Sequence, residues 1–158
     1  MLVQLNRNTV PRDFSVTATE LPVNPSTVPA SKTGPSPVVA VFGHPGRVAG
    51  LQQHLPGGWL MRRPPSLDDV RPDELVLLTG TNVREVGTAR AVLPARTRVV
   101  ALVDEDAPAE VVAGVLTAGA DVCVRGGQPS ILASHLVACR RRQTAERWAH
   151  LDADRERV

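Results

Sequence analysis

The stretch PVVAVF, residues 37–42, decides the fold class, because it is an apolar run rich in Val that ends at the loop Gly43-His44-Pro45-Gly46. A strand without polar alternation is buried on both faces, as in parallel sheets that helices cover on each side. Four further strands are predicted, at residues 59–61, 74–79, 97–103 and 121–124. Segments with helical spacing alternate with these strands, so we predict an α/β fold with a doubly wound, five-stranded parallel sheet.

The first two connections between strands are expected to be short. Val48, Leu51 and Leu55 share one face of a helix that follows the first strand. Only residues 62–71 separate the second strand from the third, which leaves room for a single turn at residues 66–70. The second helix is therefore predicted to be shortened, and this removes cover from one face of the sheet.

The remaining connections are predicted to be full helices. They span residues 83–93 and 109–118, the latter with Asp106 as its N-cap. A long final helix begins near Pro129, a residue type favoured in the first turn. It continues beyond the domain as an extended C-terminal helix or linker over residues 144–158.

Composition sets limits on the function classes. The chain has 158 residues, with 18 basic and 16 acidic side chains and a formal net charge of +2. This near-balance gives no argument for binding nucleic acid or membranes over the whole surface. No apolar run approaches the roughly 18 residues of a membrane span, and we expect a cytoplasmic protein without membrane contact. Cys123 and Cys139 lack CxxC spacing and are expected to be free thiols.

Three segments are expected along the chain. Residues 1–36 are rich in Pro, Ser and Thr, a composition that predicts a disordered arm. The α/β domain covers residues 37–143. Residues 144–158 form the helical extension, toward a possible output domain.

Candidate functional residues lie where the predicted strands end. In an open parallel sheet, ligands bind beyond the carboxyl ends of the strands. The residues at these ends are Phe42, Gly43, His44, Thr79, Thr81, Asn82, Val103, Asp104, Arg125 and Gly126. The sequence has no GxGxxG, GxxxxGK[ST] or GxSxG pattern and no HxH or HxxxH spacing. We therefore expect no catalytic residue, no metal and no cofactor.

Four segments follow a known pattern: VAVFGHPGRVAGL (39–51), RPDELVLLT (71–79), TRVVALV (97–103) and AGADVCV (118–124). In this order and spacing they resemble the receiver domain of two-component response regulators, above all those with a LuxR-type helix-turn-helix output. The resemblance covers about residues 37–143, and AGAD is its most specific part. It implies a flavodoxin-like sheet in the order 2-1-3-4-5.

The resemblance also shows which residues are missing. Working receivers hold Mg²⁺ with an acidic pair, which aligns here with Phe42 and Gly43. Their phosphate-accepting Asp aligns with Thr79, and their Ser or Thr switch residue aligns with Val103. Their Lys aligns with Gly126, or with Arg125 if the loop shifts by one residue. Phe42 and Gly43 offer no side-chain oxygen to a hard cation, so the sequence predicts a receiver that is not phosphorylated.

Three functions remain open at this point. The first is an atypical, non-enzymatic pseudo-receiver that regulates transcription or signalling through association with partners. The second is a small-molecule sensor that uses the vacated pocket, lined by His44, Thr79, Thr81, Asn82 and Asp104. The third is a small flavodoxin-like enzyme, for which no convincing acid, base or nucleophile is present.

The final helix is expected to form a homodimer or partner interface. The residues assigned to this interface are Leu132, Leu136, Cys139, Trp148 and Leu151. Leu132, Leu136 and Cys139 can also cover the sheet, whereas Trp148 and Leu151 lie beyond its expected length. The terminal HLDADRERV (150–158) is faintly similar to the LTPREREV that opens LuxR-type DNA-binding domains, which implies a DNA-binding output as a possible partner.

Overall fold

Five parallel strands form the centre of the fold in the computed structural model, which describes residues 34–157. Their order is β2-β1-β3-β4-β5. Their bounds are β1 (Val38–Gly43), β2 (Leu60–Arg62), β3 (Leu75–Thr79), β4 (Val99–Val103) and β5 (Val122–Arg125). The predicted doubly wound, flavodoxin-like sheet in the order 2-1-3-4-5 is confirmed.

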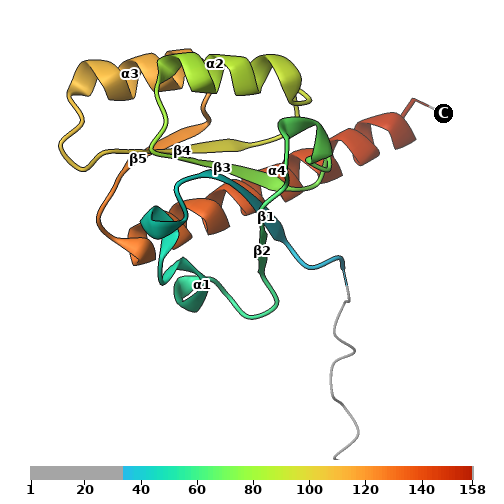
Figure 1. Cartoon of the computed structure of the whole chain (residues 1–158). Coiled ribbons are helices and arrows are strands. Elements are labelled where there is room, and N and C mark those ends of the chain that lie inside the picture. Colours follow the sequence, from blue (N-terminus) through green and yellow to red (C-terminus); the bar gives the residue numbers. More distant parts are fainter. Residues whose placement is uncertain (1–33, 158) are drawn as a thin grey trace, which may run out of the picture. The chain divides into compact units, whose positions relative to one another are not determined.

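Helices cover both faces of this sheet (Figure 1). On one face lie α2 (Val83–Val92) and α3 (Ala109–Thr117), which contact each other. On the other face lie α1 (Leu51–His54) and α4 (Pro129–Arg155). The long C-terminal helix predicted from Pro129 onward is therefore present.

Two apolar clusters fill the layers between helices and sheet. In the first, Val39 and Leu77 pack with Leu136 of α4. In the second, Val76 packs with Val86 of α2. Successive strand residues point to opposite faces, so β3 and β4 supply both clusters and are buried at every position. This double burial is why these strands are apolar without alternation.

The first connection is more broken than the sequence suggested. A 3-10 turn, η1 (Pro45–Val48), and the four-residue α1 replace a single helix after β1. Gly50 separates the two with a φ of 78°, a conformation that suits glycine. The second connection is the predicted short one, a 3-10 turn η2 (Leu67–Asp69).

The predicted N-cap of α3 is wrong. Pro108, and not Asp106, occupies the N-cap position. The chain turns earlier, because the backbone N–H of Ala107 donates to the carbonyl oxygen of Asp104 at 3.1 Å. A Pro at position 108 fixes an extended entry into the helix, and the aspartate then lies outside the first turn.

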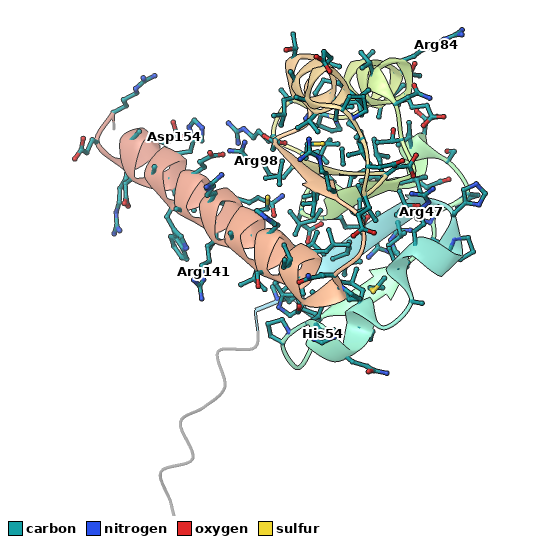
Figure 2. All side chains as sticks on the ribbon, turned by 90° about the vertical axis from the view of Figure 1, so that its left-hand side faces the viewer. Arg47, His54, Arg84, Arg98, Arg141 and Asp154 are labelled. Carbon is teal, nitrogen blue, oxygen red and sulfur yellow. The ribbon has the colours of Figure 1, made fainter. Side chains whose placement is uncertain are left out.

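Two ion-pair groups include the residues that directly precede β3, β4 and β5. Glu74 is 1% exposed, and both its carboxylate oxygens accept bonds from Arg62, each at 2.6 Å. Burial opposes the charged form of Glu74, but the bonds from Arg62 and from the Arg71 N–H outweigh it and lower the pKa of this carboxyl. Arg98, which is labelled in Figure 2, pairs with both Asp121 and Glu146 of α4.

Other predictions concern the cysteines, membranes and the arm. Cys123 and Cys139 are free, and burial raises the pKa of both thiols. Within residues 34–157, none of the helices has the length and apolar character needed to cross a bilayer. Most of the arm predicted for residues 1–36 lies outside the described residues. Residues 34–36, which are described, are exposed and belong to no helix or strand.

Candidate functional site

Thr79, the last residue of β3, lies at the centre of the candidate site. It is 4% exposed. Its hydroxyl donates toward two backbone carbonyl oxygens, that of Phe42 at 3.0 Å and that of His44 at 3.2 Å. Both acceptors belong to the end of β1 and the loop that follows. The hydroxyl thus holds this loop against β3.

Gly43 allows the loop to pass Thr79 this closely. Its φ is 96°, and it pairs with Thr79 across the β1–β3 ladder. A Cβ atom added at Gly43 would lie 2.6 Å from Thr79 Oγ1 and closer still to the carbonyl oxygen of Thr79. No side chain fits at this position without movement of the backbone.

Arg47 brings a positive charge to this end of the sheet. It extends from η1, and its Nη1 donates to Oδ1 of Asp104, just beyond β4. Its side chain also covers Gly80, where an added Cβ would lie 3.3 Å from Arg47 Nε. The two paired side chains are 40% and 60% exposed, so the pair lies at the surface. It spans the ends of β1, β3 and β4.

The sequence analysis did not single out Arg47. One signal was available, since Arg47 is the first Arg or Lys after β1. Its partner, however, lies 57 positions along the chain, at Asp104. Local spacing does not indicate such a pairing.

The ends of β4 and β5 are tied by backbone contacts. Val103 is 1% exposed and belongs to the core. Its carbonyl oxygen accepts a bond from the N–H of Gly126 at 2.9 Å. Arg125 donates from Nε to the carbonyl oxygen of Ala107 at 3.1 Å, which holds its side chain against the β4–α3 loop.

An open groove lies beside Thr79, between the end of β1, η2 and α2. Its volume is about 580 Å³. Five of the predicted site residues line it: Phe42, Gly43, Thr79, Thr81 and Asn82. Leu67, Leu78 and Ala89 supply further apolar wall. The groove lies on the face that the shortened second connection leaves less covered.

Only some of the residues predicted for a small-molecule pocket line this groove. Thr79, Thr81 and Asn82 line the groove, and Asn82 also caps α2 by accepting a bond from the N–H of Glu85 at 3.0 Å. His44 and Asp104 do not line it. His44 is exposed, and Asp104 pairs with Arg47.

The residues at the site offer few groups for phosphate or metal chemistry. Phe42, Gly43 and Thr79 carry no carboxylate, and Arg47 already neutralises Asp104. Glu105 lies against Gly127, where an added Cβ would be 3.2 Å from its Cδ. Among residues 34–157, no three His, Cys, Asp or Glu side chains are grouped so that they could hold a metal ion.

The residues predicted for a partner interface fall into two groups. Leu132, Leu136 and Cys139 are 3%, 0% and 2% exposed and belong to the core beneath α4. This burial corrects their assignment to an interface, because packing on the sheet uses their surface. Trp148 and Leu151 are 62% and 52% exposed, and they alone of the five remain open to a partner.

Comparisons with known proteins add no family. No protein-family model matches the chain, and no curated protein matches it. The geometry of the fold and of the site therefore carries the functional argument.

Proposed function

We propose that this chain is a receiver-like regulatory module that works without phosphorylation of its third strand. The observation that carries the proposal is the position of Thr79. It occupies the end of β3, where the resemblance aligns a phosphate acceptor, yet its hydroxyl is bonded to the carbonyl oxygens of Phe42 and His44. A buried and neutral hydroxyl in this setting is a poor replacement for a carboxylate nucleophile.

The charges around Thr79 support the same proposal. Transfer of a phosphoryl group needs a metal ion that neutralises the developing charge. Phe42 and Gly43 offer no side-chain oxygen, and Mg²⁺ prefers oxygen ligands in an octahedral arrangement. Arg47 instead places a fixed cation beside Asp104. The module thus carries a surface ion pair of its own at the end of the sheet where a receiver would acquire a metal.

Such a module regulates by association rather than by catalysis. The contacts of Gly43, of the Thr79 hydroxyl and of the Gly126 N–H tie the loops to the ends of the strands, and from them we infer a single loop arrangement. A phosphorylation switch needs two arrangements with different affinities for a partner. The module would therefore present one surface to an output domain or a protein partner at all times.

Intact-mass spectrometry tests the proposal after incubation with acetyl phosphate and Mg²⁺. The expected result is an unchanged mass for the wild-type chain. Thr79→Ser serves as a matched variant, because it keeps the hydroxyl and should also stay unmodified. Addition of one phosphoryl group to Thr79 would overturn the proposal.

The groove beside Thr79 favours a second function, the binding of a small molecule. Its volume of about 580 Å³ falls in the range of ligand pockets, and Phe42, Leu67 and Leu78 give it an apolar wall with polar groups nearby. A ligand there would bias the module without any covalent change. This candidate shares the fold with the first but differs in its trigger.

Thermal-shift measurements with a panel of metabolites test this second function. Thr88→Trp would fill the groove, because Thr88 is an exposed residue that lines it. Thr117→Trp is the matched control, since Thr117 is an exposed α3 residue that does not line the groove. Each hydroxyl bonds the carbonyl four residues before it. A ligand whose stabilisation persists in Thr88→Trp does not bind in the groove.

A further inference from the structure

Helix α4 continues well past the domain on which it packs. The first part of α4 packs on the domain through the buried side chains of Leu132, Leu136 and Cys139. Its last ion pair with the domain joins Glu146 to Arg98. From residue 144 to residue 157 every residue is exposed. The helix runs from the carboxyl end of β5 toward the amino ends of the strands, so this overhang lies opposite the candidate site (Figure 1).

The apolar residues of the overhang face away from the domain. At about 100° per residue, Trp148 lies roughly 160° around the helix from Glu146, which faces the sheet. Leu151 lies about 140° from Glu146 on the same reckoning, and about 100° from the buried Leu132. Both are more than half exposed, and together they form the apolar patch of the overhang. Arg141 precedes Trp148 by two turns and also points away from the domain (Figure 2).

We propose that a second copy of this chain covers the patch, with the two overhangs antiparallel. Thr144, Trp148, Leu151 and Arg155 follow the four-three spacing of a helix-pairing stripe. In an antiparallel pair, Trp148 packs against the partner's Leu151. Arg155 then lies opposite the partner's Thr144. The two-fold axis repeats this contact, so Leu151 also packs against the partner's Trp148.

Charge complementarity selects the second copy and its direction. Arg147 flanks the stripe on one side, and in the antiparallel pair it faces the partner's Asp154. The two-fold axis makes this ion pair twice. In a parallel pair, Arg155 would face the partner's Arg155, and Arg141 would face the partner's Arg141, which costs energy through like-charge repulsion. The antiparallel direction avoids both repulsions.

The domains do not obstruct this arrangement. The overlapping segments span about residues 144–155, a length of roughly 18 Å at 1.5 Å per residue. Each domain packs on a different face of its own helix from the stripe and lies at a different end of the pair. So small an interface belongs to the weak class, and we expect dissociation constants on the order of tens to hundreds of micromolar.

Sedimentation equilibrium of the 158-residue chain tests the proposal directly. The expected result is a monomer at about 5 μM and mostly dimer at about 500 μM, in keeping with an interface of this size. Trp148→Ala should weaken the dimer at least tenfold. Ile131→Ala is the matched control, because Ile131 is a 46% exposed apolar residue of the same helix outside the overhang, and it should leave dimerisation unchanged. A wild-type monomer at 500 μM would overturn the proposal.

Charge-reversal variants test the direction of the pair. Arg147→Glu and Asp154→Arg should each weaken the dimer, and the double variant should restore it. These two residues are seven positions apart, so they do not pair within one helix. Rescue of Arg147→Glu by Asp152→Arg instead would indicate a parallel pair and contradict the proposal.

Fluorescence gives an independent reading. The chain has two Trp residues, and Trp59 is 8% exposed. In a Trp59→Phe background the emission comes from Trp148 alone. It should shift to shorter wavelength as concentration rises and the indole is covered. An emission maximum that stays constant while the chain dimerises would place the interface elsewhere and refute the proposal.

Discussion

Replacing Gly43 by Ala probes the contact that closes the candidate site. The backbone of Gly43 has a φ of 96°, and the new Cβ would lie 2.6 Å from Thr79 Oγ1 and nearer still to the Thr79 carbonyl oxygen. Ordinary contacts of this kind are about 3.4 Å or longer. Because Gly43 and Thr79 are register partners in the β1–β3 ladder, their backbones cannot move apart without loss of strand pairing.

The expected loss of stability has two parts. An L-residue at positive φ costs roughly 1–2 kcal/mol. Forcing extra volume into a packed site adds about 1–3 kcal/mol. The total is about 2–5 kcal/mol, and for a domain of this size each kcal/mol lowers Tm by about 4 °C. Gly43→Ala should therefore unfold roughly 8–20 °C below the wild-type chain.

Urea and thermal denaturation measure this effect, and two glycines of the next turns are controls. Gly50 has a φ of 78° and open space around it, so Gly50→Ala reports the cost of backbone strain alone. Gly46 has no positive φ and no atom near an added Cβ, so the stability of Gly46→Ala should stay within about 0.5 kcal/mol of wild type. If Gly43→Ala proves no less stable than Gly50→Ala, the proposed clash with Thr79 does not exist. The same clash predicts that an acidic residue cannot be introduced at Gly43 without loss of stability.

Three further perturbations follow from the contacts described. Glu74→Gln should cost about 2–3 kcal/mol, because it leaves Arg62 without its buried partner. Folding lowers the pKa of Glu74, so its contribution to the free energy of unfolding is present at neutral pH and is lost as pH falls through that pKa. The difference in unfolding free energy between wild type and Glu74→Gln should therefore narrow in acid, and a difference that does not change with pH would refute this cause. Glu146→Gln should speed hydrogen exchange of the amides in residues 147–155, while the global stability measured in urea stays nearly unchanged. Equal amide protection in the wild type and the variant would show that Arg98 does not hold the overhang. Thr79→Val should cost about 1–2 kcal/mol, because it removes the single hydroxyl proton that the carbonyl oxygens of Phe42 and His44 share, and a neutral result would mean that water replaces the hydroxyl.

Much of the fold could be predicted because it depends on local pattern. Val and Leu runs without alternation predicted β1, β3 and β4, since strands buried on both faces must be apolar throughout. The short span of residues 62–71 predicted the reduced second connection. The break at Gly50 and the early turn at Asp104 were missed, because both depend on backbone conformations that apolar spacing does not encode.

The candidate site was predictable only in its location. The ends of the strands indicated where Phe42 and Thr79 would lie, and the structure brings them together. The pairing of Arg47 with Asp104 and of Arg62 with Glu74 joins residues that are distant in sequence. Such partners are chosen by the packed fold, so the charged residues alone did not indicate which pairs form.

The measurement that tests the central claim most directly is a two-dimensional NMR titration with Mg²⁺ and beryllofluoride, a mimic of the phosphoryl group. The amides of Gly43, Thr79, Gly80 and Gly126 surround the position at which a receiver is modified. The account predicts that none of them shifts, because no carboxylate at Phe42, Gly43 or Thr79 can hold the metal or the mimic. Saturable shifts at these amides that require both Mg²⁺ and beryllofluoride would contradict it.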